Sequence, residues 1–334
     1  MKDNKSIQKT ILRIAPYPTN EESGRGLHPY ELSKAEKFRV IYLTFFKRNT
    51  TYFDVPKNVE LHIGSFYTAP YPRDRNVLIK LIFAVYRLFK ITTFSFHGIF
   101  LLVWHKVDIV HVHSPMFCAV SWAAKILGKK SFITFHGTDF FRIENAFWYR
   151  RISKYFHKVF SISPVYINKL MELHSCKVLQ TYNGVEKGTY KNLNVERKKQ
   201  ILFVGALKEA KGLPVLLKGF ASFLKKYPSL WEYNLVIVGE GIMFQELKSM
   251  IFELKLGDKI TLAGQKNQQQ LVKLYNESEV FILPSLWEGF AKVLIEAMAC
   301  GCKVISTDVG SSKLLLEDWG YLIEPSNPMQ IATA

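Results

Sequence analysis

Cysteine is scarce in this chain of 334 residues. It occurs four times, at Cys118, Cys176, Cys300 and Cys302. Four scattered cysteines are too few for the disulfide framework of a small secreted domain, so the sequence fits a reducing compartment and predicts a cytoplasmic protein. Cys300 and Cys302 also lack the second pair of ligands that a structural zinc site needs, and we expect both to be small buried residues.

Apolar runs long enough to cross a bilayer are missing as well. The most apolar stretch, residues 76–104, is interrupted by Lys80, Arg87 and Lys90. No part of it reaches the roughly 18–20 uncharged residues of a transmembrane helix. Near the N-terminus, Arg13 interrupts a run that is too short for a signal peptide. We interpret that run as the first strand of a domain.

Acidic residues are few in the first part of the chain. Residues 1–200 hold 32 Lys and Arg against 14 Asp and Glu, whereas residues 201–334 hold 13 against 14. An excess of basic residues confined to one part predicts an anionic partner, such as a membrane surface or a phosphorylated substrate. Ordinary solvated lysines are the alternative. Nucleic acid has only the net charge in its favour, and we do not expect it as a partner.

Short apolar or β-branched runs do occur, and they alternate with longer helical patterns. VDIVHVH and KSFITF in the first part, and QILFVG and VFILPS in the second, end at or just before His, Gly or Ser. This pattern is typical of parallel strands buried on both faces. The sequence therefore predicts an α/β protein of two doubly wound, Rossmann-like domains that face each other across a cleft. The polar segment 183–199 is the best linker candidate, so we predict domains at residues 1–194 and 195–334.

Ligands of such sheets bind at the carboxyl ends of the strands, next to helix N-termini. The second domain has two glutamates there, Glu288 and Glu296, eight positions apart. Eight helical residues rise about 12 Å, which is the span of a nucleoside diphosphate sugar, so each carboxylate could bind the hydroxyls at one end. The diphosphate would then lie over the N–H groups of Gly289, Phe290 and Ala291. Alternatively, Glu288 caps the helix and Glu296 pairs with a nearby lysine.

The two glutamates belong to a longer segment, PSLWEGFAKVLIEAMACGCKVISTDVGSSKLLLEDWGYLIEP, at residues 284–325. It contains the glutamates separated by seven residues, an EAMA-x-G turn, an ST-x-VG loop and a closing G-x-L-x-x-P. This segment resembles the donor-site signature of the retaining glycosyltransferases of family 4, which have the two-domain GT-B fold. Upstream, FVGALKEAKG, VIVGEG and TLAGQ follow in the order and spacing of that family.

The first part of the chain resembles the family more loosely. SGRGLHPYEL at 23–32 resembles the glycine loop after the first strand, and DIVHVHSP at 108–115 resembles a strand exit that lines the cleft. FHGTDF at 135–140 resembles a second such exit. The resemblance covers nearly the whole chain and is weakest over residues 40–105.

The resemblance implies roles for the matching residues of the donor site. Glu288 would contact the donor sugar, Glu296 the ribose, and Lys211 the diphosphate leaving group. A lysine and a helix N-terminus can both offset the negative charge that builds on a departing diphosphate. Gly24 and Gly205 would let the backbone approach the donor closely, because glycine has no side chain.

The resemblance also singles out one histidine. His136, in the FHGTDF motif, would orient sugar or phosphate at the reacting centre. His111 and His113 are closer to ordinary packing residues, because strand alternation places both on one face.

The implied reaction moves a sugar with retention from a nucleoside diphosphate sugar to a glycan or lipid-linked acceptor, in surface polysaccharide biosynthesis. The motif Asp-x-Asp, with which the other common type of glycosyltransferase holds a metal and a diphosphate, does not occur. We therefore predict a metal-independent enzyme without a cofactor. The base, the sugar and the acceptor leave no signature in the sequence.

The apolar stretch at 76–104 bears on the acceptor side. On a helix, Lys80, Arg87 and Lys90 fall within about 80° of one another and leave a wide apolar face. Such a helix suits an anionic membrane interface, at the inner face of the cytoplasmic membrane and near a lipid-linked acceptor. A helix buried deeply in the first domain, with its charges outward, is the alternative, and the pattern slightly favours it.

Two features depart from the family. Ala206 stands where an arginine usually follows the FVG motif, and Lys208 or Arg25 would have to replace that charge. The sequence ends at EPSNPMQIATA, just as a helix begins, so the chain looks truncated. Both features keep open a catalytically inactive nucleotide-sugar binding or scaffolding protein, and an epimerase is a weaker third reading. A dehydrogenase is not expected, because the glycine loop lacks its third glycine.

Overall fold

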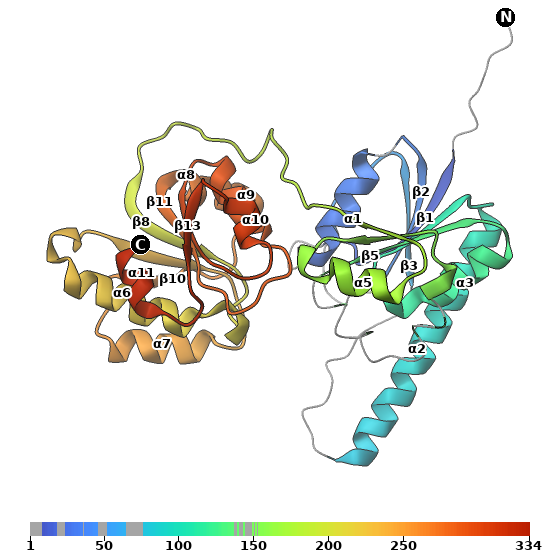
Figure 1. Cartoon of the computed structure of the whole chain (residues 1–334), viewed down its shortest axis with the longest axis horizontal. Helices are drawn as coiled ribbons and strands as arrows, with labels where there is room; N and C mark the ends of the chain where they lie inside the picture. The colour runs from blue at the N-terminus through green and yellow to red at the C-terminus, as the bar shows by residue number, and fades with distance from the viewer. Residues whose placement is uncertain are drawn as a thin grey trace, which may run out of the picture. The chain divides into compact units, whose positions relative to one another are not determined.

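A computed structural model of the chain describes residues 9–18, 24–35, 37–45, 52–64, 76–136 and 153–334, together with positions 139, 143, 149 and 151. The chain divides into two compact units, Met1–Thr181 and Tyr182–Ala334. Each unit has its own parallel sheet with helices packed on it, as Figure 1 shows. The predicted class, two Rossmann-like α/β domains, is confirmed.

The sheet of unit 1 has seven parallel strands in the order β3-β2-β1-β4-β5-β6-β7. Their bounds are β1 Thr10–Ile14, β2 Arg39–Phe45, β3 Val59–Gly64, β4 Ile109–Val112, β5 Lys130–Phe135, β6 Lys158–Ser161 and β7 Lys177–Gln180. The strand order reverses at β1 and β4. In doubly wound sheets, ligands bind at such a switch point, outside the carboxyl ends of the strands.

Helices cover the sheet of unit 1. The described α-helices are α1 Gly24–Ala35, α2 Val77–Trp104, α3 Cys118–Ile126 and α5 Ile167–Leu173, with single 3₁₀ turns η1 Pro115–Phe117, η3 Ser153–Tyr155 and η4 Pro164–Tyr166. Arg13, which interrupts the first apolar run, is fully buried on β1. Its guanidinium donates to the carbonyl of Pro29 at 2.9 Å and to Ser33 Oγ at 2.6 Å. These bonds to α1 offset part of the cost of burying the charge.

The sheet of unit 2 has six parallel strands in the order β10-β9-β8-β11-β12-β13, and its switch point lies between β8 and β11. Their bounds are β8 Lys198–Val204, β9 Asn234–Val238, β10 Ile260–Leu262, β11 Ser278–Leu283, β12 Lys303–Thr307 and β13 Gly320–Ile323. The helices are α6 Leu213–Lys226, α7 Phe244–Glu253, α8 Gln268–Glu277, α9 Lys292–Ala299, α10 Ser312–Leu316 and α11 Pro328–Thr333, with turns η5 Glu209–Lys211 and η6 Pro228–Leu230.

The expected strands are present, and the structure adds β3, β7 and β13, whose short and partly polar sequences gave no clear signal. The polar segment after β7 contains no helix or strand until β8 begins at Lys198. Cys300 and Cys302 are buried and form no disulfide, as expected. Burial raises the pKa of the Cys300 thiol to about 11.

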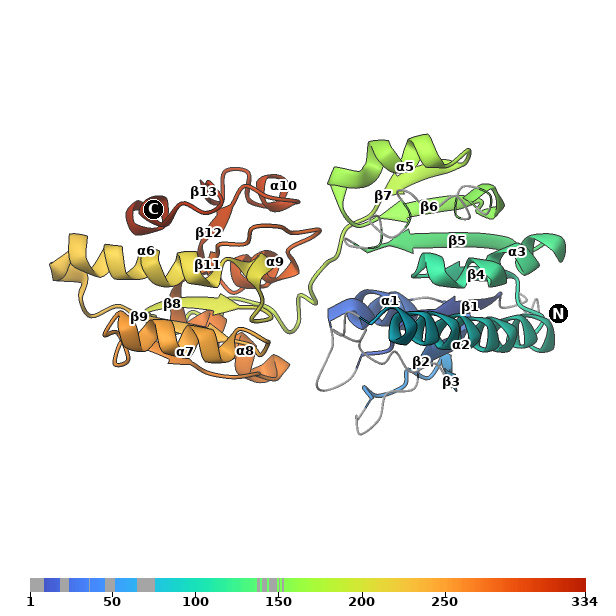
Figure 2. The same ribbon diagram turned by 90° about the horizontal axis from the view of Figure 1, so that it is seen from below.

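Helix α2 differs from its expected environment. Its C-terminal half packs on the sheet through Phe94, Gly98 and Leu101, whereas its N-terminal half extends past the sheet (Figures 1 and 2). The expectation of a deeply buried helix is wrong for this half, because Ile82 and Phe89 are 58% and 61% exposed. Among the described helices, none, α2 included, combines the length and apolarity that spanning a bilayer requires.

Candidate functional site

The candidate site of unit 2 lies at its switch point, where β8 and β11 are neighbours. The loops that follow these strands are joined by a bond from the Leu286 N–H to the carbonyl of Ala210, at 2.9 Å. Gly212 has φ 64°, and a Cβ at this position would lie 2.0 Å from the carbonyl oxygen of Pro284. Only glycine allows this close approach. The approach brings Lys211 of the first loop against Glu288 of the second.

Lys211 and Glu288 form an ion pair in which the lysine Nζ donates to Glu288 Oε1. Their side chains are only 16% and 10% exposed, so water screens the two charges weakly. Ser285 Oγ donates to the same carboxylate oxygen at 2.7 Å. Thr307 in turn donates to the carbonyl of Ser285 at 2.6 Å and fixes the loop. The carboxylate of Glu288 is therefore held in place by two donors.

Helix α9 begins just after Glu288, and its N-terminus has no side-chain cap. The Ala291 N–H donates to Ser311 Oγ at 3.3 Å. Over the continuous described stretch 153–334, the N–H groups of Gly289 and Phe290 donate to no backbone carbonyl. Such N–H groups at a helix N-terminus attract anions. The alternative in which Glu288 caps the helix is therefore not observed.

Glu296 lies on α9 and is buried. The Tyr275 hydroxyl donates to its Oε2 at 3.0 Å, and Lys292 Nζ lies 3.6 Å from its Oε1. The lysine pairing that the sequence left open is thus present, next to a tyrosine partner. Burial and the charge of Glu296 raise the pKa of Tyr275 and of Tyr190 above their ordinary range. Both tyrosines therefore remain protonated at neutral pH and can donate.

The glycine after β8 lies at the same edge of the sheet. The Gly205 N–H donates to Val238 at 3.0 Å, and a Cβ at Gly239 would lie 2.0 Å from the Gly205 carbonyl oxygen. Ala206 and Lys208, which follow, are exposed. Gly24 is the first residue of α1, and the side chain of Arg25 is outside the described part of the chain.

Histidines gather at the switch point of unit 1. His113 follows β4 and His136 follows β5, and His113 Nδ1 lies 3.1 Å from His136 Nε2. The ring of His28, on α1, lies 5.9 Å from that of His113 and 5.6 Å from that of His136. The rings of His111 and His113 are 4.3 Å apart, which places both on one side of the strand as expected.

The environment of His111 and His113 keeps these two rings neutral. Burial, aided by nearby positive charges, holds the pKa of His111 and of His113 well below the ordinary value of histidine. His111 is satisfied by Thr134 Oγ1 at 2.8 Å from its Nε2. The backbone N–H of His136 donates to Asp139 Oδ2 at 3.2 Å. Positions 137, 138 and 140 of the predicted motif lie outside the described residues.

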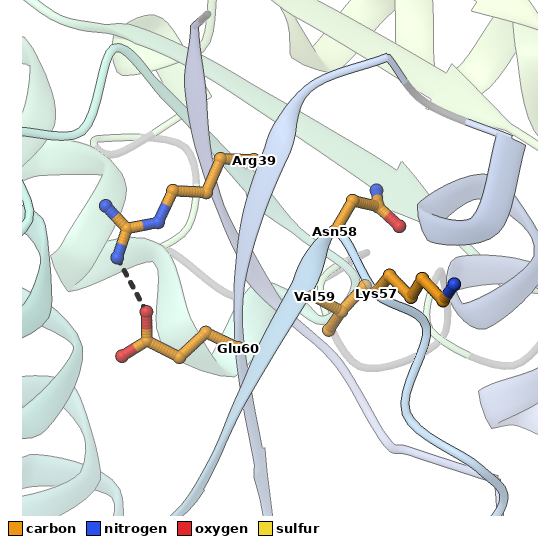
Figure 3. A pocket seen from close by; sticks show the side chains of 5 residues that line it. All are labelled: Arg39, Lys57, Asn58, Val59 and Glu60. Atoms are coloured by element: carbon orange, nitrogen blue, oxygen red, sulfur yellow. Dashed lines mark hydrogen bonds and ion pairs between the residues drawn. The ribbon is translucent and has the colours of Figure 1, made fainter.

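Within the described part of the chain, two groups of side chains are arranged so that they could hold a metal ion, each with its ligand atoms within 4.8 Å of one another. They are His28, His113 and His136, and Glu60, His62 and His105. The second group borders a hollow at the amino ends of β2 and β3, where Arg39 donates to Glu60 at 2.7 Å (Figure 3). Because substrates of α/β sheets bind at the carboxyl ends of the strands, this hollow is not a candidate substrate site.

The sequence did not predict the residues that contact the predicted site residues. Ser285 and Tyr275 bind the two glutamates, and His28 joins His113 and His136. Ser285 stands two residues after β11 ends at Leu283, and this position at a strand exit was a usable signal. Tyr275 and His28 lie on helices that precede or follow other strands, so no local pattern indicates them.

The sequence was compared with known protein families. The profile of the group 1 glycosyl transferases matches residues 186–334, and that of glycosyltransferase family 4 matches residues 31–187. Together the two profiles cover nearly all of the chain and divide it close to the boundary between the two units.

Curated relatives agree with these profiles. An uncharacterized glycosyltransferase of Methanocaldococcus jannaschii is 28% identical over 68% of this chain and 65% of its own length. A Campylobacter jejuni enzyme, N-acetylgalactosamine-N,N'-diacetylbacillosaminyl-diphospho-undecaprenol 4-alpha-N-acetylgalactosaminyltransferase, is 35% identical over 50% of this chain and 43% of its own. An amylovoran biosynthesis glycosyltransferase of Erwinia amylovora is 31% identical over 58% and 50%. The chain thus spans less than two thirds of the length of these relatives.

Solved structures share the fold. Sucrose-phosphate synthase of Thermosynechococcus elongatus has a TM-score of 0.73 at 18% identity, covering 98% of this chain and 88% of its own. The Anabaena protein HepE in complex with UDP-glucose has a TM-score of 0.67 at 16% identity, covering 97% and 88%. At these identities the likeness establishes the GT-B fold of the two units and nothing further.

Proposed function

The chain is a member of glycosyltransferase family 4, the group 1 glycosyltransferases, and we propose that it transfers a sugar, with retention, from a nucleoside diphosphate sugar to a glycan or lipid-linked acceptor. The observation that carries this proposal is the Lys211–Glu288 pair in front of the uncapped N-terminus of α9. Relatives named for amylovoran biosynthesis and for a diphospho-undecaprenol acceptor support a place in surface polysaccharide assembly.

The diphosphate of the donor is the best match for the cationic part of this site. It would replace Glu288 as the ion-pair partner of the Lys211 ammonium. It would also accept hydrogen bonds from the N–H groups of Gly289, Phe290 and Ala291. Gly205, which has no side chain, leaves room for the phosphates. Glu288, released from the lysine, can then accept hydroxyl hydrogen bonds from the sugar.

The ribose end of the donor matches Glu296. A carboxylate accepts hydrogen bonds from two neighbouring hydroxyl groups, which a ribose provides. Tyr275 and Lys292 hold that carboxylate from the side of the protein. Glu296 is thereby oriented before the nucleotide arrives, which lowers the entropy cost of binding.

In the reaction, the bond between the anomeric carbon and the diphosphate oxygen breaks, and the acceptor oxygen bonds to that carbon on the same face. The diphosphate leaves with the electron pair, and its departing oxygen takes the proton that the acceptor hydroxyl loses on the same face. Negative charge grows on the leaving group in the transition state, where Lys211 and the α9 N–H groups stabilise it. We assign to His136, in unit 1, the orientation of sugar or phosphate. Gly24, at the start of α1, would let the backbone approach the donor.

The proposal predicts turnover without a metal or a cofactor. Radiolabelled UDP-, GDP- and ADP-sugars are incubated with the chain, a chelator and either membrane lipid extract or oligosaccharide. We expect transfer from one donor class, no transfer by the Glu288→Ala variant, and an anomeric configuration in the product equal to that of the donor. Loss of turnover in chelator that Mg²⁺ or Mn²⁺ restores would contradict metal independence.

A second candidate function, an inactive nucleotide-sugar binding protein, is favoured by Ala206 alone, which removes the arginine usual in the family. It predicts nucleotide binding with no transfer from any donor and no difference between the chain and its Glu288→Ala variant. If both proteins bind nucleotide and transfer no more sugar than a sample without protein, the second function is the correct one.

We also propose a peripheral contact with an anionic membrane, made by α2. On a helix of 3.6 residues per turn, Leu78, Ile82, Val85, Phe89 and Phe96 fall within about 40–60° of one another. All five are exposed, on the side opposite Phe94 and the other buried residues of α2. The helix carries Lys80, Arg87 and Lys90 and no acidic residue, which suits an interface with anionic lipid.

Co-sedimentation with vesicles tests this contact. We expect binding to vesicles rich in phosphatidylglycerol at low salt, weaker binding to neutral vesicles, and loss of binding in the double variant Ile82→Asp, Phe89→Asp. The control is Phe252→Asp, which changes a phenylalanine of unit 2 that is even more exposed, at 84% against 61% for Phe89. Absence of binding to anionic vesicles would refute membrane contact. So would a dimer that buries the five exposed apolar residues of α2 and that the double variant dissociates.

A further inference from the structure

We propose that His28, His113 and His136 form a binding site for a transition-metal ion of the Zn²⁺ class, and that the bound ion inhibits the enzyme. Metal binding is independent of the proposed function. Inhibition by the metal rests on the proposed function, because it can be observed only if the chain transfers a sugar with the help of His136. The two parts are therefore measured separately.

The spacing of the ring nitrogens fits one ion. Zinc bonds to histidine nitrogen at about 2.0–2.1 Å in tetrahedral sites, so two nitrogens on one ion stand about 3.3 Å apart. His113 Nδ1 and His136 Nε2 lie 3.1 Å apart. A ligand atom from each of the three rings lies within 4.8 Å of the others. The His28 nitrogen must come within about 3.3 Å of the other two to complete a three-nitrogen site.

The hydrogen bonding of His113 also suits a metal ligand. A metal binds a ring nitrogen that carries no proton, and the side chain of His113 is buried. Its Nε2 is buried and has no hydrogen-bond partner among the described residues. The nitrogen that faces His136 is Nδ1, so a metal bound there replaces only the contact between these two rings. Three imidazoles form a known zinc ligand set that leaves the fourth position open.

The framework around these rings is fixed by the sheet. The His113 N–H donates to the carbonyl of Ile14 on β1 at 2.9 Å, and the His136 N–H donates to Asp139 at 3.2 Å. His28 comes from the first turns of α1. The three ligands thus come from three elements that the folded unit holds together, which favours a preformed site over a chance surface pair.

The second metal-capable group provides the natural comparison. At Glu60, His62 and His105, the guanidinium of Arg39 already occupies the carboxylate at 2.7 Å and lies 3.4 Å from His105 Nδ1. This positive charge opposes a second cation. We therefore expect the metal at the three histidines and not at Glu60, and His62 becomes the control position.

Binding is measured on the full chain after chelator treatment, by calorimetry with Zn²⁺ and by the visible absorption of Co²⁺. We expect one ion per chain and the intense absorption of tetrahedral Co²⁺. Because even partners that only orient a metal ligand contribute 10–100-fold to affinity, His113→Ala and His28→Ala should each weaken binding about 100-fold. His62→Ala should bind as the unchanged chain does. His28 is only half buried, so its variant is expected to fold even if His113→Ala does not.

Three results would overturn the site: no tight binding by the unchanged chain, equal binding after His28→Ala and His113→Ala, or loss of binding after His62→Ala. For inhibition, the rate of sugar transfer is compared with and without saturating Zn²⁺ within each variant. We expect the unchanged chain and His62→Ala to lose at least about 10-fold in rate, and His28→Ala to lose little. Tight binding without any loss of rate would refute inhibition while leaving the metal site intact.

Discussion

Lys211 donates a charged hydrogen bond to Glu288, which lies 77 residues further along the chain. Both side chains are largely buried at the β8/β11 switch point. Leaving either charge alone there would be costly, so the pair keeps the site neutral when no ligand is bound. A donor diphosphate would replace Glu288 as the partner of Lys211 and so exchange one anion for another.

Removing Lys211 should slow the departure of the leaving group, besides leaving Glu288 without its charged partner. We expect Lys211→Ala to lower kcat by about 10²–10³-fold, the usual cost of losing one group that stabilises transition-state charge. The control is Lys218→Ala, an exposed lysine on α6. Steady-state kinetics with the active donor measures both. A kcat within a factor of two of the unchanged chain would show that Lys211 does not act on the leaving group.

Gly310 should be essential for the position of Glu288. It has φ 61°, and a Cβ there would lie 2.1 Å from the Glu288 carbonyl oxygen. We expect Gly310→Ala to cost about 1–3 kcal/mol in free energy of unfolding and to abolish transfer. Gly257→Ala is the matched control, because a Cβ at Gly257 meets nothing within 4 Å. Urea unfolding of both variants measures the difference, and equal stabilities would contradict the packing described for this loop.

Tyr275 should support nucleotide binding through Glu296. Its hydroxyl donates to the Glu296 carboxylate at 3.0 Å in a buried position. Hydrogen bonds to charged groups contribute about 1.5–3 kcal/mol, so Tyr275→Phe should raise the dissociation constant of the nucleotide roughly 10-fold or more. Tyr321→Phe, at an exposed tyrosine, is the control. Calorimetric titration with the nucleotide measures both variants. An unchanged affinity in Tyr275→Phe would show that Glu296 does not bind the ribose.

Stability should fall in mild acid because of His174. This ring is buried against Tyr149, and burial lowers its pKa below the value of about 6.5 in the unfolded chain. Below that pH the unfolded chain binds a proton that the folded chain does not, so the free energy of unfolding decreases by up to about 1.4 kcal/mol per pH unit. Above it the contribution is fully present.

The test compares urea unfolding from about pH 5 to 7 in His174→Gln and in His157→Gln, an exposed control. The dependence on pH should flatten only in His174→Gln. An equal slope in both variants would show that His174 does not cause the loss of stability.

Much of the fold was predictable because it depends on local patterns. Buried parallel strands are mostly apolar, and β5 was predicted at its observed bounds, Lys130–Phe135. Strands β3 and β13 lie at sheet edges, where one side is less buried and the apolar signal is weaker. For α2, a wide apolar face fits both a buried helix and an exposed one, so it could not reveal that half of the helix extends past the sheet.

The site was predictable only in part. Glu288, Glu296 and Lys211 stand in motifs at strand ends, and the structure brings Lys211 and Glu288 together. Their supporting residues could not be predicted, because Tyr275 reaches Glu296 from another helix and is 21 residues away in the chain. The same holds for His113 and His136, which come from neighbouring strands and are 23 residues apart.

The most direct test of the central claim is thermal unfolding of the chain with UDP, GDP, ADP and CMP, in parallel with Glu296→Ala. A nucleotide at 100 times its dissociation constant adds about 2.7 kcal/mol, which raises the midpoint by several degrees for domains of this size. We predict a rise with one nucleotide class that Glu296→Ala reduces or removes. No rise with any nucleotide, or the same rise in the variant, would contradict a donor site built on Lys211, Glu288 and Glu296.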